Sequence, residues 1–180
     1  MKKINIYGMA LLALLTALSL IIFVVESMFP TFVPIPGVKL GLANVVTLFL
    51  ILNADKKSTL VVLLLRIVLA SVFAGQVISL WYSLAGGLLC FVAMSVTNSI
   101  VKGNPVWFIS VVGAIFHNVG QIAIAVLLLS WSVLAYLPFL LITGCIAGFL
   151  TGMIADVTCR KLKNSGMLGK MQKAFGKKTV

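Results

Sequence analysis

Acidic side chains are scarce in this sequence. Asp and Glu together number three in 180 residues, against 14 Lys and Arg, which gives a formal net charge of +11 at pH 7. The three acids, Glu26, Asp55 and Asp156, stand far apart, so the sequence lacks the paired aspartates that hold Mg²⁺ against a diphosphate substrate. It also lacks a Gly-x-x-x-x-Gly-Lys-Ser/Thr phosphate-binding loop, and therefore does not predict ATP hydrolysis by the chain itself.

Cysteine is equally sparse. Cys90 and Cys145 lie in apolar segments and Cys159 lies near a basic tail, without the spacing of a metal or redox pair. We therefore expect three free thiols, no metal site and no cofactor.

Long hydrophobic runs, by contrast, make up most of the chain. Hydrophobic residues account for 62% of the sequence, and the mean hydropathy is +1.21. A water-soluble domain of this length cannot bury so much apolar surface, so the sequence predicts an all-α, multi-pass membrane protein. The basic residues lie in short loops and the tail, without the aromatic-basic modules of nucleic-acid-binding proteins, and we expect no nucleic-acid partner.

The apolar runs predict a bundle of six membrane-crossing helices. The second run is short, so its ends must lie in protein or in a locally thin bilayer. We predict that both termini are cytoplasmic, because only Lys39 then lies outside and only Arg66 lies within the membrane, as the inward bias of basic residues requires. We expect a transmembrane domain over residues 1–163 and a basic cytoplasmic tail over residues 164–180, suited to anionic lipid headgroups. The expected helices span roughly residues 4–25, 39–53, 58–74, 77–101, 106–129 and 134–162.

A polar cluster interrupts the fifth apolar run, over residues 113–121 (Gly-Ala-Ile-Phe-His-Asn-Val-Gly-Gln). Hydrocarbon offers His117, Asn118 and Gln121 no hydrogen-bond partner, so they must face protein, water or a ligand. Helical spacing places His117 and Gln121 on one face, with Asn118 beside them. This face is predicted to line a small-molecule site that opens to the exterior, beneath a proline-rich external loop.

Four further residues complete the predicted substrate site. Arg66 lies near the middle of the third helix, where an unpaired guanidinium is costly, so it must have an acceptor or water. A ligand contact and a structural tie to backbone or side chains are both open for Arg66. Lys39 and Arg66 could attract an anion, Trp81 could stack on a flat ring, and Asn44 lies in the segment that opens the second helix. Glu26, about 34 Å along its helix from the first lysines, is expected to be a solvated helix end.

Small residues recur at four-residue intervals in the first and last helices. Gly144, Gly148 and Gly152 predict close helix packing. Ala13 and Ala17 allow either contact inside the bundle or docking onto another membrane subunit, and their spacing alone favours the former.

Three segments carry a family resemblance: residues 36–47 (Pro-Gly-Val-Lys-Leu-Gly-Leu-Ala-Asn-Val-Val-Thr), residues 66–70 (Arg-Ile-Val-Leu-Ala) and residues 113–121. Together they resemble the substrate-binding (S) components of energy-coupling-factor (ECF) vitamin transporters. The resemblance is to the Gx transporter subgroup, many of whose members carry the label heptaprenyl diphosphate synthase component I.

The resemblance implies a six-helix protein of the bacterial cell membrane that is not itself an enzyme. It implies that Ala13 and Ala17 contact a transmembrane scaffold subunit, and that two ATPase subunits drive import. The first external loop and the last three helices would capture a vitamin-like molecule, flavin-like or anionic, from outside.

Two other functions are consistent with the sequence. The family label suggests a membrane component of prenyl diphosphate or quinone metabolism, although no metal-binding acid pair supports it. A non-catalytic subunit of a membrane redox complex would use His117 and Gln121 only for hydrogen bonds between helices. Co-purification with scaffold and ATPase subunits would favour the transporter, and a metal-dependent prenyl product would favour the enzyme.

Overall fold

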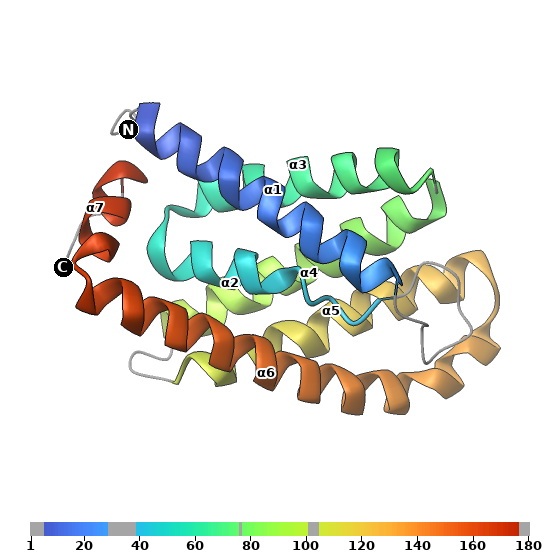
Figure 1. The fold of residues 1–180 in the computed structure, drawn as a ribbon. Coiled ribbons are helices and arrows are strands. Elements are labelled where there is room, and N and C mark those ends of the chain that lie inside the picture. Colours follow the sequence, from blue (N-terminus) through green and yellow to red (C-terminus); the bar gives the residue numbers. More distant parts are fainter. Residues whose placement is uncertain (1–5, 29–38, 76, 101–104, 177–180) are drawn as a thin grey trace.

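The described part of the chain is a bundle of helices (Figure 1). The computed structural model describes residues 6–28, 39–75, 77–100 and 105–176, and these ranges contain no strand, which confirms the all-α prediction. The elements are α1 (Ile6–Met28), α2 (Asn44–Asn53), α3 (Lys56–Ala74), α4 (Val77–Ile100), α5 (Val106–Leu128), the 3-10 helix η1 (Trp131–Tyr136), α6 (Leu137–Asn164) and α7 (Met167–Ala174).

Four segments of the described chain are long and apolar enough to cross a membrane. They are α1, α4, α5 and the continuous stretch of η1 and α6, which supports the prediction of a multi-pass membrane protein. The helix α2 has only ten residues, and α3, which carries Lys56, Lys57 and Arg66, does not belong to this set. The expected count of six crossings therefore stays a prediction.

The short helix α2 lies in the middle of the bundle, where it contacts α1 and each of α3 to α7. Its Leu48 and Leu50 have no exposed surface, and its terminal residues Asn44 and Asn53 are buried as well. Both ends of α2 therefore lie in protein, which is one of the two arrangements that its short length allowed. A ten-residue helix can occupy this position because its neighbours, and not lipid, surround it.

Glycines let α5 approach both α4 and α6 closely. A Cβ atom on Gly120 of α5 would lie 2.7 Å from the carbonyl oxygen of Ala85 in α4. A Cβ atom on Gly152 of α6 would lie 2.5 Å from the Cα atom of Trp107 in α5. Both distances are too short for a side chain, so the glycine row in α6 does mark close packing, as its spacing predicted.

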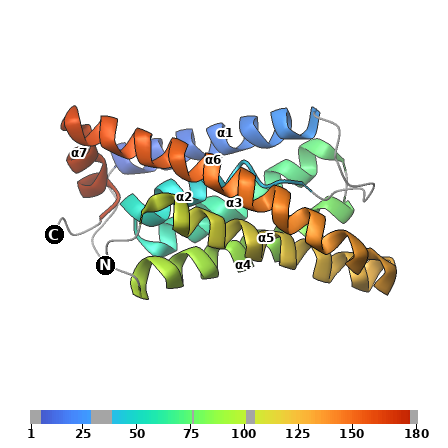
Figure 2. The same ribbon diagram turned by 90° about the horizontal axis from the view of Figure 1, so that it is seen from below.

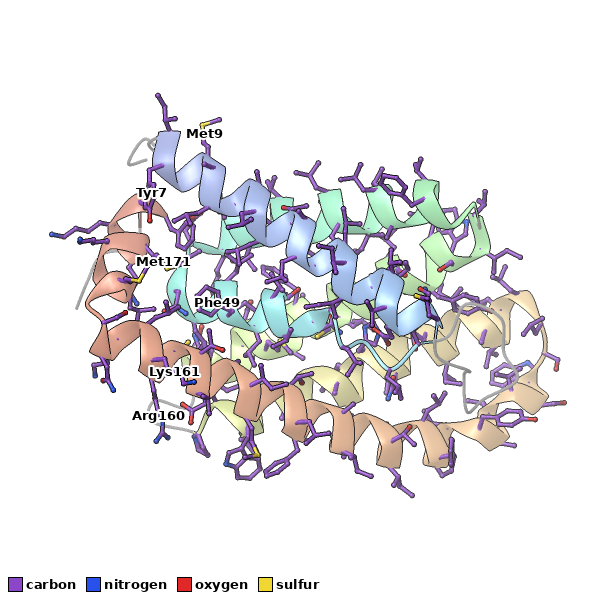
Figure 3. The ribbon with its side chains drawn as sticks, in the orientation of Figure 1. Tyr7, Met9, Phe49, Arg160, Lys161 and Met171 are labelled. Carbon is purple, nitrogen blue, oxygen red and sulfur yellow. The ribbon has the colours of Figure 1, made fainter. Side chains whose placement is uncertain are left out.

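The C-terminal helix α7 folds back onto the end of the bundle where α1 begins and where α2 turns into α3 (Figures 1 and 2). Figure 3 shows Met171 of α7 and Phe49 of α2 at this end, while Arg160 and Lys161 extend away from the helices. Met171 and Phe175 are buried in one cluster with Phe49. The sequence predicted a basic tail suited to lipid headgroups and missed this packed helix.

Candidate functional site

The site is built around residues 39–43, a non-helical segment between α1 and α2 that we call the strap. Gly41 has φ +82°, a left-handed conformation that favours glycine. A Cβ atom at this position would also lie 2.8 Å from Cδ2 of His117 in α5. Glycine at position 41 therefore allows both the turn of the strap and its close approach to the imidazole.

Glu26, near the end of α1, fixes one side of the strap. Its Oε1 accepts a hydrogen bond from the backbone N–H of Gly41 (2.6 Å), and its Oε2 accepts one from Leu42 (3.0 Å). Only 7% of Glu26 is exposed, so the expectation of a solvated helix end was wrong. The physical reason is that the strap returns over the end of α1, and two backbone donors replace water around the carboxylate.

Gln121 of α5 fixes the other side of the strap. With its amide oriented so that both polar atoms have partners, it donates to the carbonyl oxygen of Lys39 (2.9 Å) and accepts from Lys39 N (3.2 Å) and His117 Nε2 (3.3 Å). His117 is buried, and its Nδ1 lies against Gly86 of α4 but has no partner of hydrogen-bond geometry among the residues that the structure describes. The polar cluster of α5 therefore faces the strap and α4.

Arg66 of α3 is buried beside the strap, with 5% of its surface exposed. Within the described residues, its Nη2 donates one long hydrogen bond, 3.4 Å, to Oδ1 of Asn44, and its Nε has no partner. Asn44 is the first residue of α2, so this bond ties α3 to the point where the strap ends.

Lys39 enters the site from the start of the strap. Its Nζ donates to the Ser27 hydroxyl and lies 3.5 Å from the centre of the Phe23 ring, a cation–π contact. Partial burial lowers the pKa of Lys39 from its usual value, and the nearby Glu26 carboxylate opposes this change.

These side chains surround a cavity with about 330 Å³ of empty space, counted up to its open mouth. Only a small part of this space is wide enough to admit a water molecule, so a vitamin-sized ligand would require the strap or its neighbours to move. The charged and strongly polar lining residues are Glu26, Lys39, Arg66, His117 and Gln121, and the others are Phe23, Gly41, Ile67, Ala70 and Ser83.

The structure brings most of the predicted substrate-binding residues together. The lining of this cavity includes Lys39, Arg66, His117 and Gln121. Asn44 is not part of this lining, but it accepts a hydrogen bond from Arg66. Asn118 instead donates to the carbonyl oxygen of Leu140 in α6 (2.5 Å). Trp81 lies on α4 with 53% of its surface exposed, outside the cavity lining.

Ala13 and Ala17 lie on the exposed face of α1 and contribute to neither cavity. Large apolar side chains surround them on that face, including Leu14 and Leu18. The described helices therefore leave this pair of small residues open to lipid or to another protein.

Sequence reasoning missed two features of the site. Glu26 is one, and its position about one helix length from the N-terminus gave no indication that the strap returns to it. The other is a second, shallower hollow with about 210 Å³ of empty space counted up to its open mouth, which includes Gly41, Asn44, Ser110 and Thr151 in its lining. Gly41 lines both cavities, so they adjoin at the strap.

Comparison with known proteins yields one match. A family model described as heptaprenyl diphosphate synthase component I matches residues 15–158, which include every residue lining the two cavities but not α7. No curated protein matches the chain significantly, and no solved structure does. Among the described residues, no group of three or more His, Cys, Asp or Glu side chains is placed to hold a metal ion.

Proposed function

The chain belongs to the family described as heptaprenyl diphosphate synthase component I, and we propose that it is the substrate-binding S component of an ECF-type importer. The observation that carries this proposal is the buried polar cavity beneath the strap. Apolar bundles pay a large free-energy cost for buried charged groups, so such groups within them commonly mark a ligand or ion site. Here Glu26, Lys39, Arg66, His117 and Gln121 converge on one cavity.

In this proposal the cavity faces the outside of a bacterial cell. Lys56, Lys57 and the basic residues of α7 lie at one end of the bundle, which supports a cytoplasmic position for that end. The end of α1 lies toward the opposite end, and the strap follows it in sequence. Substrate would enter from that side when the strap moves.

The exposed face of α1 is the proposed contact with the transmembrane scaffold subunit. Small residues let two helices approach closely in lipid, where packing and not water exclusion drives association. Ala13 and Ala17 offer such a contact because no described helix covers them. Two ATPase subunits on the scaffold would supply the energy for import.

The family description favours a second candidate function, a membrane component of prenyl diphosphate metabolism. In that case the cavity would bind part of a prenyl substrate or product, and the activity would depend on a catalytic partner. The two candidates differ in the proteins that accompany the chain.

Purification of the tagged chain from its native membrane in mild detergent tests the proposal. We expect a transmembrane scaffold protein and two ATPases to co-purify in fixed ratio. The double variant Ala13→Leu/Ala17→Leu should lose them, because added side chains separate the helices, whereas Ala123→Leu, at an exposed alanine of α5, should retain them. Recovery of a prenyltransferase in place of the ATPases would refute the importer and support the second candidate.

A further inference from the structure

The charges around the cavity indicate what kind of ligand it holds. We infer that the ligand is a small organic monoanion whose carboxylate pairs with Arg66 inside the cavity. The inference rests on the proposed function in taking this cavity as the substrate site. Among vitamin-like substrates, it selects those that carry a single negative charge.

Arg66 lacks the partners that a buried guanidinium requires. A guanidinium carries five N–H donors in a planar fork, and a buried charge is stable only when it is paired and hydrogen-bonded. In the described chain Arg66 has one hydrogen bond, the long contact with Asn44, and its Nε has none. With 5% of the residue exposed, bulk water does not compensate for the missing partners.

Glu26 is near enough to attract Arg66, but within the described chain it forms no contact ion pair with the guanidinium. Its two oxygens accept hydrogen bonds from the strap, at Gly41 and Leu42. No ion pair joins Glu26 to Lys39 or Arg66 in the part of the chain that the structure describes. The carboxylate therefore holds the backbone in place, while Lys39 donates to a neutral hydroxyl and Arg66 to a neutral amide.

The count of charges on the cavity leaves one positive charge in excess. Lys39 and Arg66 contribute two positive charges and Glu26 one negative charge, and His117 counts as neutral at pH 7. A ligand with a single negative charge neutralises this excess. A dianion would exceed it, and a cation would add to the repulsion at a buried site.

A carboxylate also fits the geometry that Arg66 leaves unused. Its two oxygens match the parallel N–H donors of a guanidinium, an arrangement that strengthens both hydrogen bonds. The same cavity is lined by Phe23, Ile67 and Ala70, which offer an apolar surface to the remainder of a small organic molecule. The cavity therefore combines one anion site with an apolar wall.

A set of probes that share one ring but differ in charge tests this inference. Benzoate, benzamide, phenyl phosphate and benzylammonium carry one negative charge, no charge, two negative charges and one positive charge. Each is added at millimolar concentration and constant ionic strength to the full chain in detergent, and the thermal unfolding midpoint is measured. We expect benzoate to raise the midpoint most, and nicotinate to exceed nicotinamide in the same way.

Substitutions of Arg66 locate the effect. Arg66→Met should weaken benzoate binding about tenfold to hundredfold, which is the range for a charge-assisted hydrogen bond lost from a buried site. Arg66→Lys keeps the positive charge but lacks the paired N–H donors of the guanidinium. It should bind every probe more weakly, with benzoate still the strongest. This variant replaces Arg66→Met in the test if Arg66→Met does not fold. The control Arg160→Met removes an exposed arginine paired with Asp156 on α6, and should bind benzoate as the natural chain does.

Three results would overturn the inference. One is stabilisation by benzamide, phenyl phosphate or benzylammonium equal to or greater than that by benzoate. Another is the absence of stabilisation by either acid at millimolar concentration. The third is unchanged benzoate binding in both Arg66 variants. If any of these occurred while the ATPases still co-purified, the ligand class would be wrong and the importer would stand. Benzoate binding without ATPases would support the site and refute the importer.

Discussion

The contact between Gly41 and His117 allows a prediction with an internal reference. Gly41→Ala places a methyl group 2.8 Å from the His117 ring and from Nδ2 of Asn44, in a residue with φ +82°. The left-handed conformation costs about 1–2 kcal/mol for a residue with a Cβ atom. Overlap in a packed interior costs about 1–3 kcal/mol more. We therefore expect Gly41→Ala to lower the free energy of unfolding by about 2–5 kcal/mol.

Gly75→Ala separates these two costs. Gly75 ends α3 with φ +63°, and apart from its neighbours in the chain no atom of the described residues lies within 4 Å of the position that its Cβ would take. This variant should lose about 1–2 kcal/mol, the backbone cost alone. Both variants can be compared by equilibrium unfolding in mixed detergent micelles, with tryptophan fluorescence as the signal of unfolding. Equal losses would mean that the strap does not rest on the imidazole, and the account of the site would be refuted.

Three further predictions concern the strap, the cavity and α7. Glu26→Gln removes the negative charge from the cavity lining, so the affinity for phenyl phosphate should rise relative to that for benzoate. An unchanged ratio of these two affinities would show that Glu26 does not set the charge preference. Gln121→Ala should accelerate hydrogen exchange at the amide of Lys39, whose partner it removes, with exchange in α7 unchanged; equal protection in both proteins would contradict that hydrogen bond. Phe175→Ala should lower the free energy of unfolding by about 3–5 kcal/mol because Phe175 is buried, whereas Lys173→Ala, at an exposed residue, should change it by less than about 0.5 kcal/mol. Similar losses in the two variants would argue that α7 is not packed on the bundle.

The sequence revealed the inward-facing residues where polarity contrasted with its surroundings. His117 and Gln121 interrupt an apolar run, and no satisfactory arrangement leaves such groups against lipid. The same reasoning applied to Arg66, a charge in the middle of a helix. Polarity showed that these residues turn inward, but it did not show what they contact.

The orientation of apolar helices was harder to infer. In a soluble helix the apolar face turns inward, but in a membrane both the interior and the lipid are apolar, so periodicity does not mark the buried side. Trp81 illustrates this limit, since its aromatic character suggested a ligand contact and the structure places it on the exposed face of α4.

Long-range contacts of the backbone could not be inferred either. Glu26 is buried because the strap returns to the end of α1, and that path depends on the left-handed turn at Gly41 and on the imidazole beneath it. A glycine among leucines gave no sign of this turn. The packed helix α7 was missed for a related reason, because its few apolar residues acquire a partner only when α2 ends beside them.

The placement of Gly41 in the lining of both cavities has a mechanical consequence. The two hollows adjoin at Gly41, in a strap that a carboxylate and a carboxamide hold by hydrogen bonds to its main chain. A displacement of this segment would therefore change the size of both hollows at once. A few hydrogen bonds to the main chain of the strap thus control the space that a ligand can occupy. A ligand with equivalent polar groups could replace these hydrogen bonds one by one.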